Sequence, residues 1–279
     1  MGPRILVLLA AVAFSTGGAA IKLCSLNGWQ VSSFRSAVAA LAVLVLARPA
    51  RRDFDRRVWL VGAAFAATLI GFAVANKLTT AANAIFLQST APLYVLLLAP
   101  SLLGEHFQRR DLGVMIAMAV GMALFFVGEQ PSFASAPEPV RGNLVAALSG
   151  LTWALTVLGL RWLSRAGSGP GPMLLIGNLL ASAVCLPLAL PVVDASLMDW
   201  ALIVYLGVFQ LVGAYLLLSA GLRHLTAIEG MLLLLLEPVL NPVWAALVQG
   251  EVPGALSLAG GAVILGATVW KTVADARPR

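Results

Sequence analysis

One acidic residue lies deep inside an apolar stretch of this sequence and is the first candidate for chemistry. Glu237 stands about ten residues from either end of the run 227–248 and directly precedes Pro238. Asn241 and Trp244 follow at i+4 and i+7, so on a helix the three side chains share one face. An ionised carboxylate at membrane depth costs several kcal/mol unless it is solvated or paired. Two interpretations stay open: Glu237 binds a substrate amine or a coupling proton, or in protonated form it makes a structural hydrogen bond.

Two prolines interrupt apolar runs at corresponding places. Pro92 lies near the middle of the run 82–103, and Pro238 holds the matching place in the run 227–248. A proline inside a helix removes one backbone hydrogen bond and leaves the carbonyl four residues earlier without its donor. At membrane depth such a break can line a polar cavity and act as a hinge. The pattern favours hinges at both prolines about as strongly as it favours simple packing kinks.

Other large polar or aromatic side chains occupy the remaining runs. Asn83, Thr90 and Tyr94 stand at i, i+7 and i+11, whereas Gln88 falls on another face. Ser and Thr in membrane spans usually bond backbone carbonyls or mediate packing, so a single one indicates structure more often than binding. Large polar or π surfaces must find partners. The stronger candidates for binding are therefore Gln88, Trp153 and Gln210.

Charged residues inside or beside the runs need a separate explanation. Arg35 lies about a turn and a half inside the second run, where it can snorkel outward, pair with a carbonyl or an acid, or hold an anionic substrate group. We favour a structural role for Arg35, and more strongly so for Lys22 and Lys77. Glu105 and Glu251, each preceded by a glycine at the end of a run, are expected to cap helices or to pair with nearby loop groups.

The elements that carry these side chains follow from composition. Hydrophobic residues make up 60% of the 279 residues and charged residues 11%, whereas soluble domains carry about 25% charged residues. Ten apolar runs recur along the chain, each close to the roughly 20 residues that a spanning helix needs. They cover residues 5–23, 31–47, 58–76, 82–103, 112–128, 142–162, 172–191, 200–221, 227–248 and 255–272. The sequence predicts an all-α polytopic membrane protein of ten transmembrane helices.

The basic residues set the expected orientation in the lipid bilayer. All but four of the 18 Lys and Arg residues fall at the N-terminus, in alternate loops or at the C-terminus, whereas Lys22, Lys77 and Arg141 lie on the opposite side. By the positive-inside rule, both termini are expected in the cytoplasm of a bacterial inner-membrane protein. A nucleic-acid partner would need the basic residues clustered with stacking aromatics on one surface, so the net charge of +6 does not indicate one.

The two halves of the chain match each other. Thr80-Ala81, Pro92, Gly104-Glu105 and Leu112 recur as Thr226-Ala227, Pro238, Gly250-Glu251 and Leu258, at an offset of 146 residues, which is 226 minus 80. Because five spans are an odd number, the second half must enter the membrane in the opposite orientation, as in the inverted repeats of secondary transporters. We expect a first five-helix repeat at 1–128, an extracytoplasmic linker at 129–141 and a second five-helix repeat at 142–279.

Several classes of function lack the residues that they need. The chain has no Gly-x-x-x-x-Gly-Lys-Ser/Thr loop, so neither ATP hydrolysis nor an ATPase subunit is indicated. His106 and His224 lie far apart in expected turns, and Cys24 and Cys185 lie in distant apolar segments. Neither pair offers a metal site. We therefore expect no enzyme, no catalytic residue, no metal and no cofactor.

The Thr-Ala, Pro, Gly-Glu and Leu signatures of both halves, together with Phe34 and Arg35 in the second run, resemble the ten-helix EamA-type branch of the drug/metabolite transporter superfamily. Within it, the chain is most similar to bacterial exporters of aromatic amino acids. The resemblance implies a basket of two inverted five-helix bundles, with the third, fourth, eighth and ninth helices around a central cavity. Mapped helix by helix, it implies a substrate-binding set of Asn83, Gln88, Thr90, Trp153, Gln210, Tyr215 and Glu237, to which the shared face of Glu237 adds Asn241.

One departure from the superfamily bears on coupling. The short four-helix relatives use an acid in their first span for proton coupling, but here that span carries only Ser15 and Thr16 at midlength. Glu237 is the one candidate at midmembrane depth to replace that acid. The expected function is a secondary active or facilitative transporter that exports amino acids, aromatic or neutral, and related small metabolites by alternating access, as a monomer. The alternatives are a multidrug or nucleotide-sugar carrier and, from another class, a membrane-embedded lipid or prenyl transferase.

Overall fold

The structure is a computed structural model built from helices. It describes residues 2–46, 54–103, 109–124, 127, 136–165, 167–222, 233–234 and 236–276. In chain order its elements are α1 (Pro3–Leu23), α2 (Gly28–Leu46), α3 (Arg56–Leu78), α4 (Ala81–Gln88), α5 (Ala91–Leu103), α6 (Arg109–Ala123), α7 (Pro139–Arg165), α8 (Pro170–Ala189), α9 (Leu197–Tyr205), η2 (Leu206–Gly213), α10 (Ala214–Leu222), α12 (Leu236–Gln249) and α13 (Ala255–Ala276). No β-strand occurs in the described part of the chain, which confirms the predicted all-α class.

The helices suit a lipid environment. Within the described ranges, six helical segments are long and apolar enough to cross a membrane: α1, α2, α3, α8, most of α7, and the segment from α9 through η2 into α10. Large apolar side chains stay exposed on outward faces, among them Leu41 of α2, Val184 of α8 and Leu247 of α12, which are 64%, 62% and 73% exposed. Exposed apolar surface of this kind marks contact with a membrane. The chain is thus a polytopic membrane protein, while the ten spans and their orientation stay predictions.

The predicted span at 82–103 is interrupted in the structure. A short turn separates α4 from α5, and within it the Oγ1 atom of Thr90 donates a hydrogen bond of 2.6 Å to the carbonyl oxygen of Leu87. Gly150 of α7 packs on this turn, where a Cβ atom would lie only 3.0 Å from the same carbonyl oxygen. Pro92 follows the turn as the second residue of α5. A proline in the first turn of a helix costs little, because the N–H group it lacks has no partner there.

The second half of the chain contains a different irregularity, a π-helical segment. Pro238 lies within α12, which the structure describes from Leu236, and it is buried. The span before it contains η2, a π-helical segment of eight residues between α9 and α10. Such segments are rare and frequently occur at functional sites. The sequence analysis did not predict η2, and the hinge roles of Pro92 and Pro238 stay predictions.

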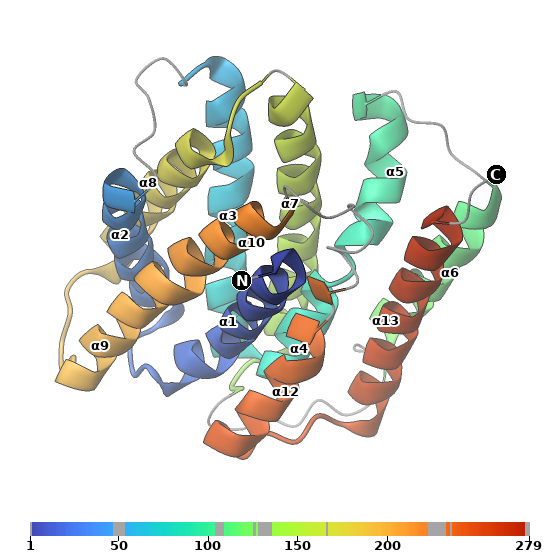
Figure 1. The fold of residues 1–279 in the computed structure, drawn as a ribbon. Coiled ribbons are helices and arrows are strands. Elements are labelled where there is room, and N and C mark those ends of the chain that lie inside the picture. Colours follow the sequence, from blue (N-terminus) through green and yellow to red (C-terminus); the bar gives the residue numbers. More distant parts are fainter. Residues whose placement is uncertain are drawn as a thin grey trace.

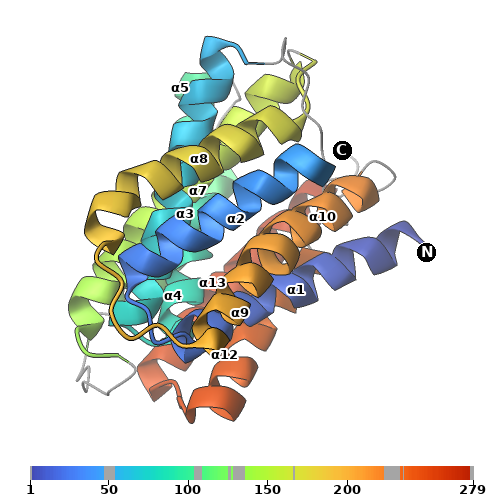
Figure 2. The same ribbon diagram turned by 90° about the vertical axis from the view of Figure 1, so that its left-hand side faces the viewer.

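The helices form two groups that meet around α1 and α3. On one side, α3 packs against α7 and α8, and α8 packs against α2. Figure 2 shows α2 and α8 running side by side. On the other side, α1 packs against α10, η2 and α12. The pair α6 and α13 lies at the edge of the molecule opposite α2 and α8 (Figure 1).

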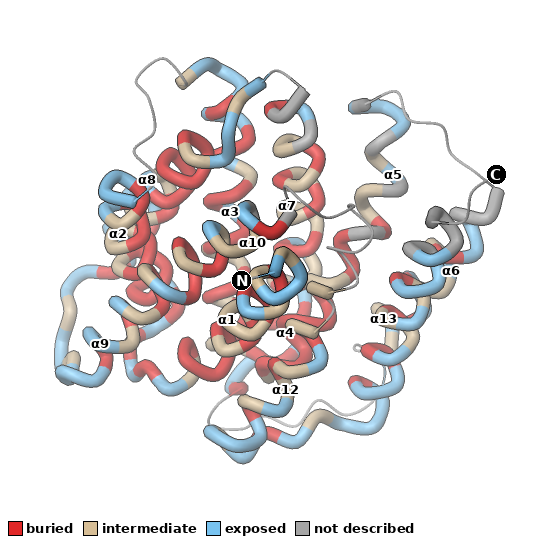
Figure 3. Tube along the Cα trace, in the orientation of Figure 1, coloured by how far each residue is buried: buried red, intermediate tan, exposed pale blue. Residues whose placement is uncertain are grey.

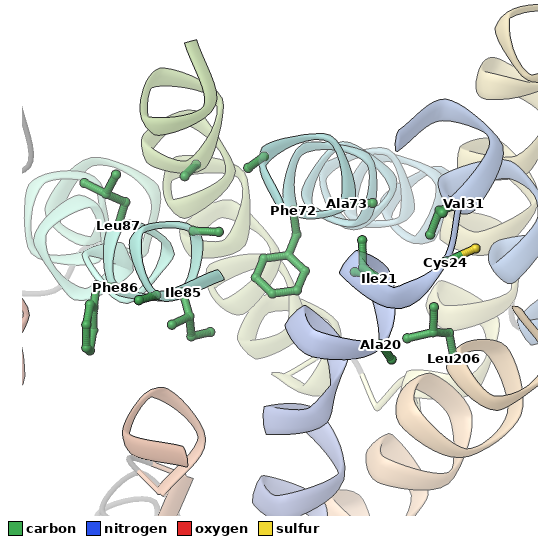
Figure 4. Packing of buried hydrophobic residues seen from close by; sticks show 14 of the residues in the cluster. Ala20, Ile21, Cys24, Val31, Phe72, Ala73, Ile85, Phe86, Leu87 and Leu206 are labelled. Carbon is green, nitrogen blue, oxygen red and sulfur yellow. The ribbon is translucent and has the colours of Figure 1, made fainter. Parts of the chain in front are cut away.

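Two clusters of buried apolar side chains hold these groups together. One joins α1, α3, α4 and the start of η2, and Figure 4 shows its Phe72 ring between Ile85 of α4 and Ile21 of α1. The other joins α2, α3, α8 and η2, with Phe65 and Met173 among its members. Burial is dense along α3, α4 and α8, whereas α6 and α13 expose most of their outward surface (Figure 3). The packed centre is therefore where side chains from both halves of the chain meet.

Candidate functional site

A cavity lies in the middle of the bundle, among side chains of α1, α2, α3, α4, α7, η2, α10 and α12. It holds about 760 Å³ of space that no atom fills, part of it open to solvent. Both halves of the chain contribute to its wall. Five members of the predicted substrate-binding set line this cavity: Gln88, Trp153, Gln210, Tyr215 and Glu237.

One wall of the cavity is aromatic. The Tyr215 ring meets Phe14 edge-on, with centroids 5.1 Å apart, and meets Phe65 in the same way at 5.5 Å. Trp153 and Phe72 also line the cavity. Edge-on packing holds each ring in a defined orientation. The sequence analysis missed the three phenylalanines, because an aromatic residue in an apolar span carries no signal that it faces a cavity.

A polar network that joins α4, α7 and α3 supports a second part of the cavity wall, at Gln88 and Thr68. The Nε2 atom of Gln88 donates to the Oγ atom of Ser149 over 2.7 Å, and this Oγ atom donates to the carbonyl oxygen of Thr68 over 3.3 Å. The Oγ1 atom of Thr68 in turn donates to Thr152 over 3.0 Å. The hydroxyl groups act between helices, as expected of Ser and Thr in membrane spans. Their effect is to hold the Gln88 amide in place on the cavity wall.

Gln210 reaches the cavity from η2. Its side chain packs against Gly17 of α1, where a Cβ atom would lie 2.7 Å from the Nε2 atom of Gln210. Gly17 therefore leaves the space that the amide occupies. Among the residues that the structure describes, the Oε1 atom of Gln210 has no hydrogen-bond donor, although it is buried. Buried polar atoms normally have a partner, so this oxygen is an acceptor that the fold leaves unused.

The cavity wall also carries two charged groups. Arg35 of α2 is only 1% exposed, and its Nη2 atom donates to the carbonyl oxygen of Leu69 over 2.7 Å. Glu237 of α12 lines the same cavity. Between described residues the ion pairs are Lys22–Glu251 and Glu138–Arg141, so neither Arg35 nor Glu237 belongs to one. A buried cation and a half-buried acid thus share a cavity without forming a pair with each other.

The three other predicted binding residues lie outside this cavity. Asn83 is buried and donates from Nδ2 to the Oδ1 atom of Asn143 over 3.2 Å. The Thr90 hydroxyl belongs to the turn between α4 and α5. Asn241 is fully buried against Gly18 of α1, where a Cβ atom would lie 2.8 Å from its Oδ1 atom. Asn83 and Thr90 make hydrogen bonds that hold helices and turns together, whereas both amide atoms of Asn241 have no hydrogen-bond partner among the described residues. A role for these three residues in binding stays a prediction.

A buried ion pair closes one end of the bundle, where α1 ends and α4 begins. The Nζ atom of Lys22 lies 2.7 Å from the Oε1 atom of Glu251, and both side chains are at most 5% exposed. The Oε2 atom of Glu251 accepts a hydrogen bond of 2.9 Å from the backbone N–H of Ala81, the first residue of α4. We call Lys22, Glu251 and Ala81 the Glu251 cluster. The pairing expected for Glu251 thus involves a residue far away in the sequence.

Some sequence motifs lie outside the residues that the structure describes. They are Gly104-Glu105, Thr226-Ala227, both histidines and residues 129–135 of the expected linker. Within the described part of the chain, no group of three or more His, Cys, Asp and Glu side chains is arranged to hold a metal ion.

Comparison with known proteins identifies the architecture. The EamA-like transporter family matches the chain twice, at residues 3–127 and 140–272. A solved crystal structure matches with a TM-score of 0.65 at 21% identity and covers 98% of this chain and 96% of its own, which shows a shared fold.

Two of three relatives that match most of this chain carry transporter names. The pseudopaline exporter CntI of Pseudomonas aeruginosa is 29% identical over 277 residues, which are 95% of this chain and 94% of that protein. The uncharacterized transporter YdfC of Bacillus subtilis is 29% identical over 246 residues, 85% of this chain and 79% of that protein. An uncharacterized protein of Pseudomonas aeruginosa, PA1977, is 30% identical over 278 residues, 94% of this chain and 93% of that protein.

Proposed function

Because the chain belongs to the EamA-like transporter family, we propose that it exports amino acids, aromatic or neutral, and related small metabolites across a bacterial inner membrane. The observation that carries this proposal is the cavity, which combines aromatic rings with unpaired polar and charged groups. Small-molecule sites are mostly apolar with a few placed polar groups, and they occur between the helices of bundles. The aromatic wall suits an apolar side chain, and the polar wall suits the backbone of an amino acid.

Alternating access is the proposed mechanism, with two five-helix repeats at 1–128 and 142–279 that move about Pro92 and Pro238. The two separate matches to one family support a duplicated chain. The position of the cavity between helices of both halves supports a site at the repeat interface. The Glu251 cluster and the apolar cluster around Ile21 support closure at the end where α1 terminates. A single chain then suffices, so we propose a monomer.

Glu237 is the proposed coupling residue. Its carboxylate has no ion-pair partner among described residues, so a proton and a substrate ammonium group can compete for it. Protonation on one side of the membrane would release the substrate, and deprotonation on the other side would allow it to bind. Such competition makes export respond to a pH gradient.

The experiment is counterflow of labelled amino acids in proteoliposomes, with and without an imposed pH gradient. We expect saturable exchange of aromatic or neutral amino acids, and we expect Glu237→Gln to lose the response to the gradient while the protein stays folded. Absence of exchange for every amino acid in a well-folded preparation would overturn the substrate class. Unchanged flux and pH dependence in Glu237→Gln would remove the coupling role of this residue.

The relatives and the alternative functions add further compounds to the transport assay. The pseudopaline exporter supports an outward direction of transport and makes pseudopaline a compound to include. Flat aromatic cations and nucleotide sugars belong in the panel as well, because a multidrug or nucleotide-sugar carrier is the alternative within the superfamily. Saturable transport of one of these in place of amino acids would favour that alternative.

A further inference from the structure

Arg35 has more hydrogen-bonding capacity than the fold uses. A guanidinium group carries five N–H donors and keeps its charge in proteins. Among the described residues, Arg35 makes one hydrogen bond, from Nη2 to Leu69, and its buried Nε atom has no acceptor. One carbonyl does not neutralise a buried cation, and an unpaired charge at membrane depth is costly. If Arg35 only fastened α2 to α3, most of its N–H donors and its positive charge would have no function.

The missing counter-charge is not supplied by Glu237. Among the described residues the two groups form no ion pair, although both line the same cavity. A direct ion pair would fill this space with protein atoms. Without such a pair, the cavity has room for a molecule whose anionic group meets Arg35 and whose cationic group meets Glu237.

On the basis of the proposed function, we infer that Arg35 binds the carboxylate of the transported amino acid, while Glu237 and Gln210 receive its ammonium group. A guanidinium fork matches a carboxylate with two parallel hydrogen bonds. The ammonium group has three donors, and the free Oε1 atom of Gln210 and the Glu237 carboxylate are acceptors on the same cavity. The substrate class is therefore an α-amino carboxylate with an apolar or aromatic side chain.

The same charges exclude the other candidates. A cationic drug lacks the carboxylate, so it would leave Arg35 buried without a counter-ion and add a like charge to the cavity. A nucleotide sugar would bring two phosphates to a cavity whose described wall offers one cation and one acid. Specificity arises here because the wrong ligand leaves a buried charge unpaired.

The test uses four ligands on one scaffold: L-phenylalanine, its methyl ester, phenethylamine, which lacks the carboxylate, and 3-phenylpropionate, which lacks the amine. Binding to purified protein is measured by calorimetry, and counterflow is measured in proteoliposomes. We expect each ligand that lacks one charge to bind about 10- to 100-fold more weakly than phenylalanine, as for the loss of a hydrogen-bonded charge. In Arg35→Gln, phenylalanine should lose its advantage over phenethylamine and over the methyl ester. Arg35→Lys should retain part of it.

Arg141→Gln is the matched control, because Arg141 is an exposed arginine in an ion pair at the start of α7. It should bind all four ligands as the unchanged protein does. If Arg35→Gln fails to fold, the ligand series on the unchanged protein and Arg35→Lys still decide the question. Equal binding of phenethylamine and phenylalanine, or retained discrimination in Arg35→Gln, would overturn the inference.

The outcomes also separate this inference from the proposed function. Arg35-dependent binding of phenylalanine without counterflow would support the inference and contradict transport of this amino acid. Counterflow of phenylalanine that phenethylamine inhibits equally well would support transport and contradict the role of Arg35. If the protein shows no binding and no counterflow of any amino acid, both the inference and the proposed function are overturned.

Discussion

The charged side chains of the Glu251 cluster are paired with each other, whereas those of the cavity are not. In the Glu251 cluster the cation and the acid lie 2.7 Å apart, and the second carboxylate oxygen accepts a backbone N–H group. In the cavity, Arg35 and Glu237 share one wall without pairing. Both acids lie in the second half of the chain and both cations in the first. Each site thus combines a basic residue of the first half with a glutamate of the second half, and the sites differ in whether the two groups are in contact.

This difference indicates what each site is for. A buried charge whose partner is in the protein is satisfied in the folded state, so its removal should be felt mainly in stability. A buried charge without a partner in the protein does not stabilise the fold, so its removal should be felt mainly in binding. The predictions that follow test this division, from the largest expected change in stability to the smallest.

The largest change is expected for Lys22→Met. This variant leaves the Glu251 carboxylate buried with one backbone N–H donor, and breaking a buried pair in this way costs about 3–5 kcal/mol. Thermal unfolding in detergent measures the loss.

The control for Lys22→Met is the double variant Lys22→Met with Glu251→Leu, which removes both charges. It should recover a large part of the lost stability, because no uncompensated charge remains. A double variant less stable than Lys22→Met would contradict a role for the ion pair itself and would point to the bond between Glu251 and Ala81.

An intermediate pair of effects is expected from neighbouring glycines of α1. Gly18→Ala would place a Cβ atom within 3.1 Å of two buried amides, those of Asn241 and Asn76, and should destabilise the protein by about 1–3 kcal/mol. Gly17→Ala would meet the end of the flexible Gln210 side chain in the cavity. This side chain can move aside, so the stability should change by less than about 1 kcal/mol while binding weakens.

The readouts are unfolding temperature and phenylalanine affinity for both glycine variants. Gly266→Ala in α13 is the control, since a Cβ atom there meets nothing within 4 Å. If Gly17→Ala unfolded more readily than Gly18→Ala, the face of α1 toward Gln210 would be more tightly packed than the face toward Asn241 and Asn76. That result would contradict this comparison.

The smallest change in stability is expected for Glu237→Gln. The substitution keeps the shape of the side chain and breaks no ion pair between described residues, so the free energy of unfolding should change by less than about 1 kcal/mol. Transport driven by a pH gradient should nevertheless be lost. A destabilisation as large as that of Lys22→Met would show that Glu237 is a structural charge after all.

Much of the candidate site could be predicted from residue type and depth. Gln88, Trp153, Gln210, Tyr215 and Glu237 line one cavity because large polar or amphipathic side chains in apolar spans turn away from lipid. Asn83 and Asn241 met the same criterion, but they face other helices, where they are equally well hidden from lipid. Depth and helical face indicate which side chains point inward. They do not indicate whether a cavity or a packed neighbour is found there.

Arg35 is a second case in which sequence position did not indicate what the side chain meets inside the protein. Its sequence position allowed three roles, and we favoured a structural one. The bond to Leu69 agrees with that choice, whereas the position on the cavity wall and the unused donors do not. The sequence could not distinguish these possibilities, because the number of donors that remain free depends on which carbonyls from α3 come within reach.

By itself the sequence determined the helical class, the membrane environment and the match between the two halves. Long apolar runs favour transfer from water to lipid, and in lipid the backbone must satisfy its own hydrogen bonds as helices. Only the tertiary structure decided which charges pair. Lys22 meets Glu251, whereas Arg35 and Glu237 do not meet each other, and no spacing along the chain distinguishes these two cases. The physical reason is that hydrogen bonds and ion pairs act over a few ångströms, and only the packing of helices far apart in the sequence sets distances of that size.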